Sequence, residues 1–232
     1  NVTVEVDDTT VGNTPDASAN FTLNLTDLIF NDPFLVKDIR TGSSGSSPRS
    51  LTAVGNTLFF RASDGVNGEE LWKSDGTEAG TVLVKNIRPG SNSSNSNYLT
   101  AVGNTLFFRA NDGVNGNELW QSDGTASGTV LVKDIRPGSY YGYPVGSFPE
   151  SLTVVGNTLF FIASDGVNGE ELWKSDGTAS GTVLVKDIRP GSYLGFPASS
   201  SIEKLTVVGN TLFFSASDGV NGEELWKSDG TE

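Results

Sequence analysis

The stretch Glu-Leu-Trp-Lys-Ser-Asp-Gly-Thr at residues 70–77 is the key to this sequence, because it returns three more times almost unchanged. Its tryptophan recurs as Trp120, Trp173 and Trp226. Each copy lies in a longer unit that begins Leu-Thr-(Ala/Val)-Val-Gly-Asn-Thr-Leu-Phe-Phe and continues through Asp-Gly-Val-Asn-Gly. After the first three copies follows Thr-Val-Leu-Val-Lys-(Asn/Asp)-Ile-Arg-Pro-Gly. Self-similarity at a period near 50 residues indicates a propeller or another repeat array.

Each unit predicts four short strands, which in the first copy cover 51–54, 57–63, 70–73 and 81–87. Gly55-Asn56 predicts a two-residue hairpin with a type II′ turn, because glycine takes the first central position. The Ser-Asp-Gly-Thr segment predicts a turn in which the serine and aspartate side chains accept hydrogen bonds from backbone amides. A four-stranded antiparallel sheet followed by a long connector is the plan of a propeller blade.

Counting these units predicts an all-β fold, a β-propeller of about four blades. Complete units cover 51–87, 99–135 and 152–188, and an incomplete one covers 205–229. Residues 34–39, Phe-Leu-Val-Lys-Asp-Ile, match the last strand of a unit and could close the ring as the missing fourth strand. Two alternatives stay open: the array continues beyond this sequence, or residues 34–39 complete the last blade of another molecule and form an open polymer. The predicted propeller domain is 33–232.

Residues 1–32 lie outside the repeat and predict an N-terminal β extension. Residues 1–6 and 21–25 alternate apolar with polar side chains, as half-buried strands do. Without a partner in the repeat, these strands either cap the propeller or pair with another chain. The expected assembly residues are Val2, Val4, Val6, Phe21, Leu23 and Leu25.

Composition excludes several kinds of site and partner. The net charge of -13 disfavours binding to nucleic acid and to anionic membrane surfaces. Cysteine, histidine and methionine are absent, so the sequence offers no disulfide, no thiolate or imidazole zinc ligand and no Cys or His nucleophile–base pair. No apolar run approaches the roughly 20 residues that span a bilayer, which predicts no membrane insertion. Cations and neutral glycans stay compatible with this composition.

The Glu-Leu-Trp-x-Ser-Asp-Gly-Thr core and the following Val-Lys-Asp-Ile-x-Pro-Gly closely resemble the bacterial ELWxxDGT repeat family over residues 34–232. The resemblance implies a secreted or cell-surface protein of bacteria, cyanobacteria among them. It implies no agreed activity.

The acidic loops are the first candidate site. Calcium takes six to eight oxygen ligands from carboxylates, amides and carbonyls, and glycine-rich loops can supply them. The spacing departs from the EF-hand pattern, and a turn in which Asp and Asn bind local amides is the favoured explanation. No cofactor is certain, and calcium is the one candidate. The candidate ligands are Asp64, Asn67, Glu69, Asp112, Asn115, Asp165, Asn168, Glu170, Asp218, Asn221 and Glu223.

The connectors between units are the second candidate site, because variation among the copies concentrates there. Exposed aromatic rings on them could stack on sugars or bind a protein, whereas rings that fold back over the blades would be structural; we favour the structural alternative. The candidate ligand face consists of Tyr140, Tyr141, Tyr143, Phe148, Tyr193 and Phe196. In a propeller these connectors share a face with the Asp-Gly-Val-Asn-Gly loops.

Three functions follow from the sequence. The leading hypothesis is a non-catalytic, extracellular structural or adhesive protein that self-assembles through its N-terminal strands into a filament or surface layer. The alternative is a glycan-binding propeller, with a cell-surface glycan as the partner. A propeller glycosidase or lyase ranks third, because no asymmetric pair of carboxylates stands out from the repeats. The sequence therefore predicts that the protein is not an enzyme.

Overall fold

The computed structural model describes residues 33–231. Contacts divide the chain into residues 1–35 and residues 36–232, and the description below concerns the second unit. The predicted strands and assembly residues at 1–32 lie outside the described residues. In the described part of the chain, no helix is long and apolar enough to cross a membrane.

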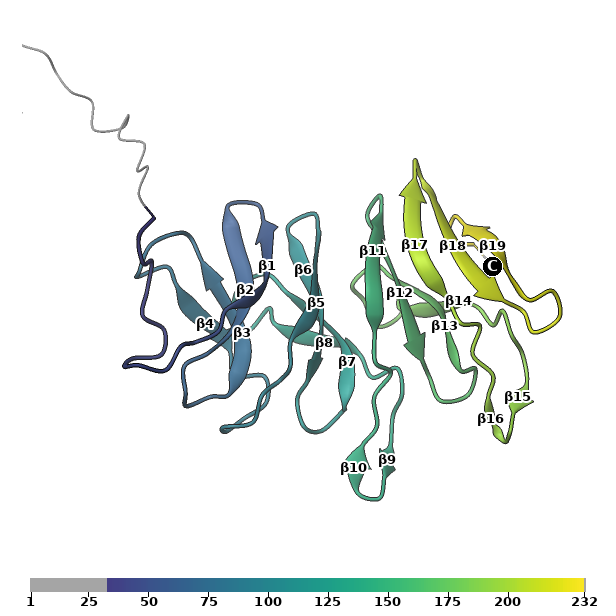
Figure 1. The fold of residues 1–232 in the computed structure, drawn as a ribbon, viewed down its shortest axis with the longest axis horizontal. Helices are drawn as coiled ribbons and strands as arrows, with labels where there is room; N and C mark the ends of the chain where they lie inside the picture. The colour runs from purple at the N-terminus through teal and green to yellow at the C-terminus, as the bar shows by residue number, and fades with distance from the viewer. Residues whose placement is uncertain (1–32, 232) are drawn as a thin grey trace, which may run out of the picture. The chain divides into compact units, whose positions relative to one another are not determined.

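The described residues form β-strands and no helix, in sheets that repeat with the sequence (Figure 1). The first sheet contains β1 (Arg49–Val54), β2 (Thr57–Ser63), β3 (Glu69–Ser74) and β4 (Val82–Lys85). The second contains β5 (Asn97–Val102), β6 (Thr105–Asn111), β7 (Asn117–Ser122) and β8 (Val130–Lys133). The third contains β11 (Glu150–Val155), β12 (Thr158–Ser164), β13 (Glu170–Ser175) and β14 (Val183–Lys186). The fourth has three strands, β17 (Glu203–Val208), β18 (Thr211–Ser217) and β19 (Glu223–Ser228).

Within each sheet, every strand pairs antiparallel with the next one along the chain, as the sequence predicts. The predicted two-residue hairpin joins β1 to β2, with Val54 opposite Thr57. Gly55 has a φ of 56°, and Asn56 is not among the positive-φ residues, which fits a type II′ turn. A bulge lies between Leu71 and Trp72 in the pairing of β3 with β4 and recurs in the next two sheets. The prediction of an all-β fold of four-stranded antiparallel sheets is confirmed.

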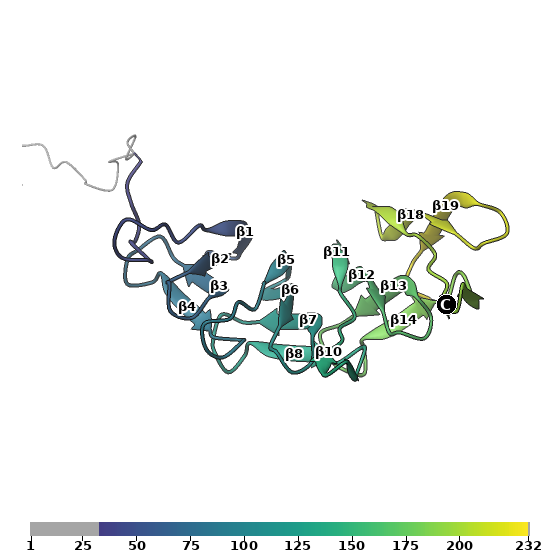
Figure 2. The ribbon, with the colours of Figure 1, turned by 60° about the horizontal axis from the view of Figure 1, so that its bottom comes forward.

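The sheets follow one another in chain order (Figure 2). Trp120, Trp173 and Trp226 each belong to an apolar cluster that joins two consecutive sheets. Contacts between first strands run from β1 to β5, from β5 to β11 and from β11 to β17. Trp120 packs against Phe59 and Leu71 of the preceding sheet, and Trp173 packs against Phe107 and Leu119 of its own preceding sheet. The second strands of the second and third sheets, β6 and β12, are buried on both faces, as expected for sheets that stack, whereas β18 of the fourth sheet is buried on one face.

Residues 34–39 do not form the predicted strand. Instead Ile39 packs against Phe60 and Trp72 of the first sheet, and Lys37 Nζ donates a 2.8 Å hydrogen bond to the carbonyl oxygen of Thr81. No described strand pairs with the outer edge of β19. Ring closure by residues 34–39 is therefore not observed among residues 33–231.

Candidate functional site

Two of the connectors form short β-hairpins that the sequence did not predict. β9 (Ser139–Tyr140) pairs with β10 (Tyr143–Pro144), and β15 (Ser192–Tyr193) pairs with β16 (Phe196–Pro197). In each hairpin an aromatic pair faces across the strands: Tyr140 opposite Tyr143, and Tyr193 opposite Phe196. We call these two segments the aromatic hairpins (Figure 1).

The turns of the aromatic hairpins place a bulky residue in the left-handed region. Tyr141 and Gly142 have φ values of 50° and 80°, and Leu194 and Gly195 have values of 51° and 84°. Two consecutive positive values are the pattern of a type I′ turn, whose twist matches the two strands. Glycine adopts such values freely, but a tyrosine or a leucine does so at a cost of about 1–2 kcal/mol. The base of each hairpin is closed by a backbone hydrogen bond, Val145 N to Gly138 O at 3.2 Å and Ala198 N to Gly191 O at 3.0 Å.

The apolar side chains of the aromatic hairpins are exposed. Tyr140, Tyr141 and Tyr143 are 69%, 84% and 76% exposed, and the second hairpin is similar, with Phe196 at 74%. The explanation in which these rings fold back over the blades is wrong. Tyr140 and Tyr141 form an edge-to-face pair at the hairpin tip, with ring centroids 4.4 Å apart and an angle of 72° between the ring planes.

The connectors and the Asp-Gly-Val-Asn-Gly loops lie together, as expected for one face of a propeller-type sheet array. Glu69 N donates to Ser93 Oγ at 3.0 Å, and Phe148 N donates to Asn117 O at 3.0 Å. Gly68, with a φ of 75°, lies so close to the connector that a Cβ there would be 2.6 Å from Asn92 O. Phe148 is half-exposed on this face.

The candidate calcium ligands are arranged as turns closed by their own hydrogen bonds. Asp64 Oδ1 accepts from the amides of Val66 and Asn67 at 2.8 Å, and Asp64 Oδ2 accepts from Asn67 Nδ2 at 2.6 Å. The same three bonds recur around Asp112, Asp165 and Asp218. Oε2 of Glu69 lies 3.6 Å from Nε of Arg61. The equivalent side chains of Glu170 and Glu223 are exposed. Within residues 33–231, no three Asp or Glu side chains gather as a metal site would require.

Two aspartates that the sequence did not single out lie near these loops. Asp134 and Asp187 each have a buried Oδ1 with no hydrogen-bond partner. Burial raises the pKa of Asp134, and the charge of Asp112 raises it further. Calcium binding stays a prediction.

The sequence also did not predict a buried glutamate in each complete sheet. Glu70, Glu118 and Glu171 are fully buried, although each belongs to the Glu-Leu-Trp motif. Glu118 Oε1 accepts from the amides of Arg136 and Ser147 at 3.3 and 2.8 Å, and its Oε2 accepts from Ile135 N at 3.2 Å and from Ser147 Oγ. The carboxylate thus ties the end of β8 and the following connector to β7. We call Glu70, Glu118 and Glu171 the buried glutamates.

The buried glutamates predict a stability that falls as the pH rises from about 5 to 8. Burial raises the pKa of each to about 7, against the lowering effect of their hydrogen bonds. This pKa lies above the value of 4.5 for an unfolded glutamate. The stabilising contribution of the buried glutamates is therefore fully present below pH 4.5 and is lost as the pH rises through about 7. In contrast, hydrogen bonds from Thr77 and its equivalents hold the pKa of Asp75, Asp123, Asp176 and Asp229 below the usual range. Their contribution is lost as the pH falls below about 4, so maximal stability is expected near pH 5.

The measurement is urea unfolding followed by tryptophan fluorescence at several pH values and at low protein concentration. The control is Glu118→Gln, whose amide does not titrate and which should reduce the fall in unfolding free energy between pH 5 and 8. A urea midpoint of the wild type that rises between pH 5 and pH 8 would contradict the raised pKa of the buried glutamates.

No protein-family model matches this chain, and no curated protein matches it. Solved structures similar to it include one described as an exo-beta-1,3-galactanase from Bifidobacterium bifidum s17 (11% identity, TM-score 0.35) and Bacteroides ovatus Xyloglucan PUL GH43B (18% identity, TM-score 0.37). A third is an endo-arabinase from Bacteroides thetaiotaomicron VPI-5482 (15% identity, TM-score 0.31). The matches cover 77%, 82% and 78% of this chain, which spans 65%, 40% and 73% of the three proteins.

These similarities contradict two predictions from the sequence. A non-catalytic structural or adhesive role and the statement that the protein is not an enzyme are not supported, because the similar structures carry the names of glycosidases. Neither prediction is retained. At 11–18% identity and TM-scores of 0.31–0.37, the similarity transfers neither a substrate nor a catalytic residue to this chain.

Proposed function

We propose that the four sheets are blades of a propeller-type array that binds a neutral carbohydrate through the aromatic hairpins. The observation that carries this proposal is the exposure of Tyr140, Tyr143, Tyr193 and Phe196 on two hairpins of the same geometry. The resemblance to the repeat family adds the proposal that the protein acts outside the cell, where such a partner would be a cell-surface glycan.

Aromatic rings held in solvent favour a ligand with flat apolar faces and polar edges. A sugar ring offers C–H groups on its faces, which pack on aromatic rings, and hydroxyl groups at its edge, which stay hydrated or bind the phenol hydroxyls. The net charge of -13 opposes anionic ligands and leaves neutral polysaccharides unaffected. Exposed aromatic side chains held at a conformational cost in the turn are more typical of a binding surface than of packing.

The two aromatic hairpins follow the second and the third sheet, so one molecule carries the same kind of surface twice. A polysaccharide repeats its own unit and can contact both surfaces at once. The second contact is then intramolecular, and weak binding at each hairpin gives a higher overall affinity.

The test is affinity electrophoresis and isothermal titration calorimetry with neutral polysaccharides, including a galactan, an arabinan and a xyloglucan. We expect at least one polysaccharide to bind. The double variant Tyr140→Ala with Tyr143→Ala should weaken that binding about tenfold, a loss of about 1.4 kcal/mol in binding free energy. The matched control is Tyr98→Ala, because Tyr98 is also a partly exposed tyrosine but lies in β5, under Arg109 and outside the aromatic hairpins. Absence of binding to every polysaccharide, or equal binding by the double variant, would reject the proposal.

The same mixtures are assayed for released reducing ends, which separates binding from cleavage. Cleavage that is lost in the double variant would place the aromatic hairpins in substrate binding by an enzyme. Binding without cleavage would assign them to carbohydrate recognition alone.

A further inference from the structure

Glu118 binds both ends of the segment that carries the first aromatic hairpin. Its Oε2 accepts a hydrogen bond from Ile135 N at 3.2 Å, ahead of β9, and its Oε1 accepts one from Ser147 N at 2.8 Å, beyond β10. The hydroxyl of Ser147 donates to the same carboxylate. Ser147 O in turn accepts from Ser164 N of the next sheet at 3.0 Å. One buried carboxylate therefore fixes both the point where the hairpin leaves the second sheet and the point where it returns.

Glu171 repeats this arrangement around the second aromatic hairpin. It accepts from Ile188 N at 3.1 Å, ahead of β15, and from Ser200 N at 3.1 Å and Ser200 Oγ at 2.7 Å, beyond β16. Ser217 N of the fourth sheet donates to Ser200 O at 2.8 Å. Detaching either leg of the hairpin would leave a buried carboxylate with fewer donors, which is costly, so this contact restricts the movement of the whole segment.

Close backbone packing holds the returning leg of each hairpin in the same place. Gly116 has a φ of 73°, and a Cβ there would overlap the carbonyl group of Val145, which follows β10. At the second hairpin, Gly169 has a φ of 76° and approaches Ala198 in the same way. Glycine permits both the positive φ and the close approach. The base of each aromatic hairpin is therefore packed directly on the loop of the preceding sheet.

The first sheet has the same glutamate but no hairpin. Glu70 accepts from Ile87 N at 3.0 Å and from Ser94 N at 3.0 Å. The segment between these two contacts is 88–93, whereas the equivalent segments are 136–146 and 189–199. The two longer segments contain the aromatic hairpins. The contacts of the glutamate are thus constant among the complete sheets, and the segment held between them differs.

We propose that Glu118 and Glu171 are positioning residues of the carbohydrate site, which hold the two aromatic hairpins in the orientation that the ligand contacts. This inference rests on the proposed function, because it names what orients the rings of that site. The rings themselves are largely exposed, so packing does little to orient them. Both glutamates are fully buried and therefore act through the hairpins rather than on the ligand. Rings that are already ordered bind without the cost of being immobilised.

The first experiment compares Glu118→Gln, Glu171→Gln and Glu70→Gln in the whole chain. Glutamine has nearly the same shape and keeps one acceptor oxygen, but its amide nitrogen cannot accept from the donors that face the other oxygen. Titration calorimetry with a polysaccharide that binds the wild type should show about threefold weaker binding for Glu118→Gln and for Glu171→Gln. Glu70→Gln is the matched control. It changes the same buried motif position but should bind as the wild type does, because its connector carries no hairpin.

Hydrogen exchange measured by NMR without any ligand reports on the hairpins themselves. Val145 N and Ala198 N donate the hydrogen bonds at the two hairpin bases. Glu118→Gln should speed the exchange of the Val145 amide about tenfold and leave that of Ala198 unchanged, and Glu171→Gln should do the reverse. Glu70→Gln should change neither. This crossed pattern distinguishes local positioning from a general loss of stability.

The outcomes separate this inference from the proposed function. Equal weakening of polysaccharide binding by Glu70→Gln and Glu118→Gln would overturn the inference, because general destabilisation would then explain both. Wild-type binding by Glu118→Gln and Glu171→Gln, or unchanged exchange of the Val145 amide in Glu118→Gln, would also overturn it. If no polysaccharide binds the wild type, the proposed function fails, and the exchange pattern alone decides whether the glutamates position the hairpins.

Discussion

Glu118→Ala is expected to destabilise the protein by about 3–5 kcal/mol, a large share of the stability of a small domain. The substitution leaves the amides of Ile135, Arg136 and Ser147 and the hydroxyl of Ser147 without their acceptor in a buried place. Each buried donor left unpaired costs about 1–3 kcal/mol, and the small side chain leaves a void that water fills only in part. The measurement is the urea midpoint of the variant relative to the wild type at pH 5 and pH 7.

Glu224→Ala is the matched control, because the same motif position is exposed on β19. Its effect is expected to stay within about 0.5 kcal/mol, as for other surface substitutions. Equal effects of the two variants would show that the hydrogen bonds of Glu118 do not stabilise the fold.

The repeats allowed the sheets to be predicted from the sequence, and the reason is physical. Alternation of apolar residues, the Gly-Asn hairpin and the Ser-Asp-Gly-Thr turn act over a few residues, so each strand carries its own local signal. Gly76 N donates to Ser74 Oγ at 3.0 Å and Thr77 N donates to Asp75 Oδ1 at 2.9 Å, as the turn sequence predicts.

The buried glutamates were missed because their partners are distant in the sequence. Glu70 accepts hydrogen bonds from the amides of Ile87 and Ser94, which lie 17 and 24 residues away. A glutamate beside a tryptophan in a strand is ordinarily taken as a surface residue, since charged side chains are rarely buried without partners. The available signal was its position: Glu70 and Trp72 are two residues apart and therefore lie on the same face of β3.

The aromatic hairpins and residues 34–39 were mispredicted for different reasons. The hairpins have strands of two residues, too short for alternation, and their turns contain Tyr141 and Leu194 where glycine or asparagine is usual. Residues 34–39 have the sequence of a strand but are not a strand in the described structure, because strand pairing depends on the rest of the fold as well as on the segment. Its docking through Lys37 and Ile39 depends on the first sheet and could not be inferred from the segment alone.

Trp173→Ala is expected to destabilise the contact between the second and third sheets by about 3–5 kcal/mol. Trp173 is 6% exposed and packs in one cluster with Phe107, Leu119 and Phe161. In an array of repeats, each sheet is stabilised mainly by its neighbours, so weakening one contact divides the cooperative unit. Urea unfolding should therefore change from one transition to two, and limited proteolysis should first cut the connector at residues 139–150.

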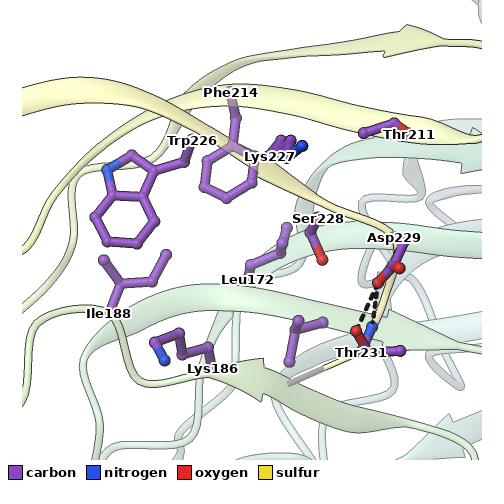
Figure 3. A pocket seen from close by; sticks show the side chains of 11 residues that line it. Leu172, Lys186, Ile188, Thr211, Phe214, Trp226, Lys227, Ser228, Asp229 and Thr231 are labelled. Atoms are coloured by element: carbon purple, nitrogen blue, oxygen red, sulfur yellow. Dashed lines mark hydrogen bonds between the residues drawn. The ribbon is translucent and has the colours of Figure 1, made fainter.

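Trp226→Ala is the control for this prediction, because Trp226 occupies the same motif position but is only partly buried beside the open edge of β19. We expect a smaller loss, since part of its ring contributes no buried area in the single molecule. Trp226 lines a cavity of about 360 Å³ together with Phe214 and Ile188 (Figure 3), whereas Trp173 is buried in its cluster. Losses of equal size in the two variants would show that burial between two sheets does not explain the stabilising effect of Trp173.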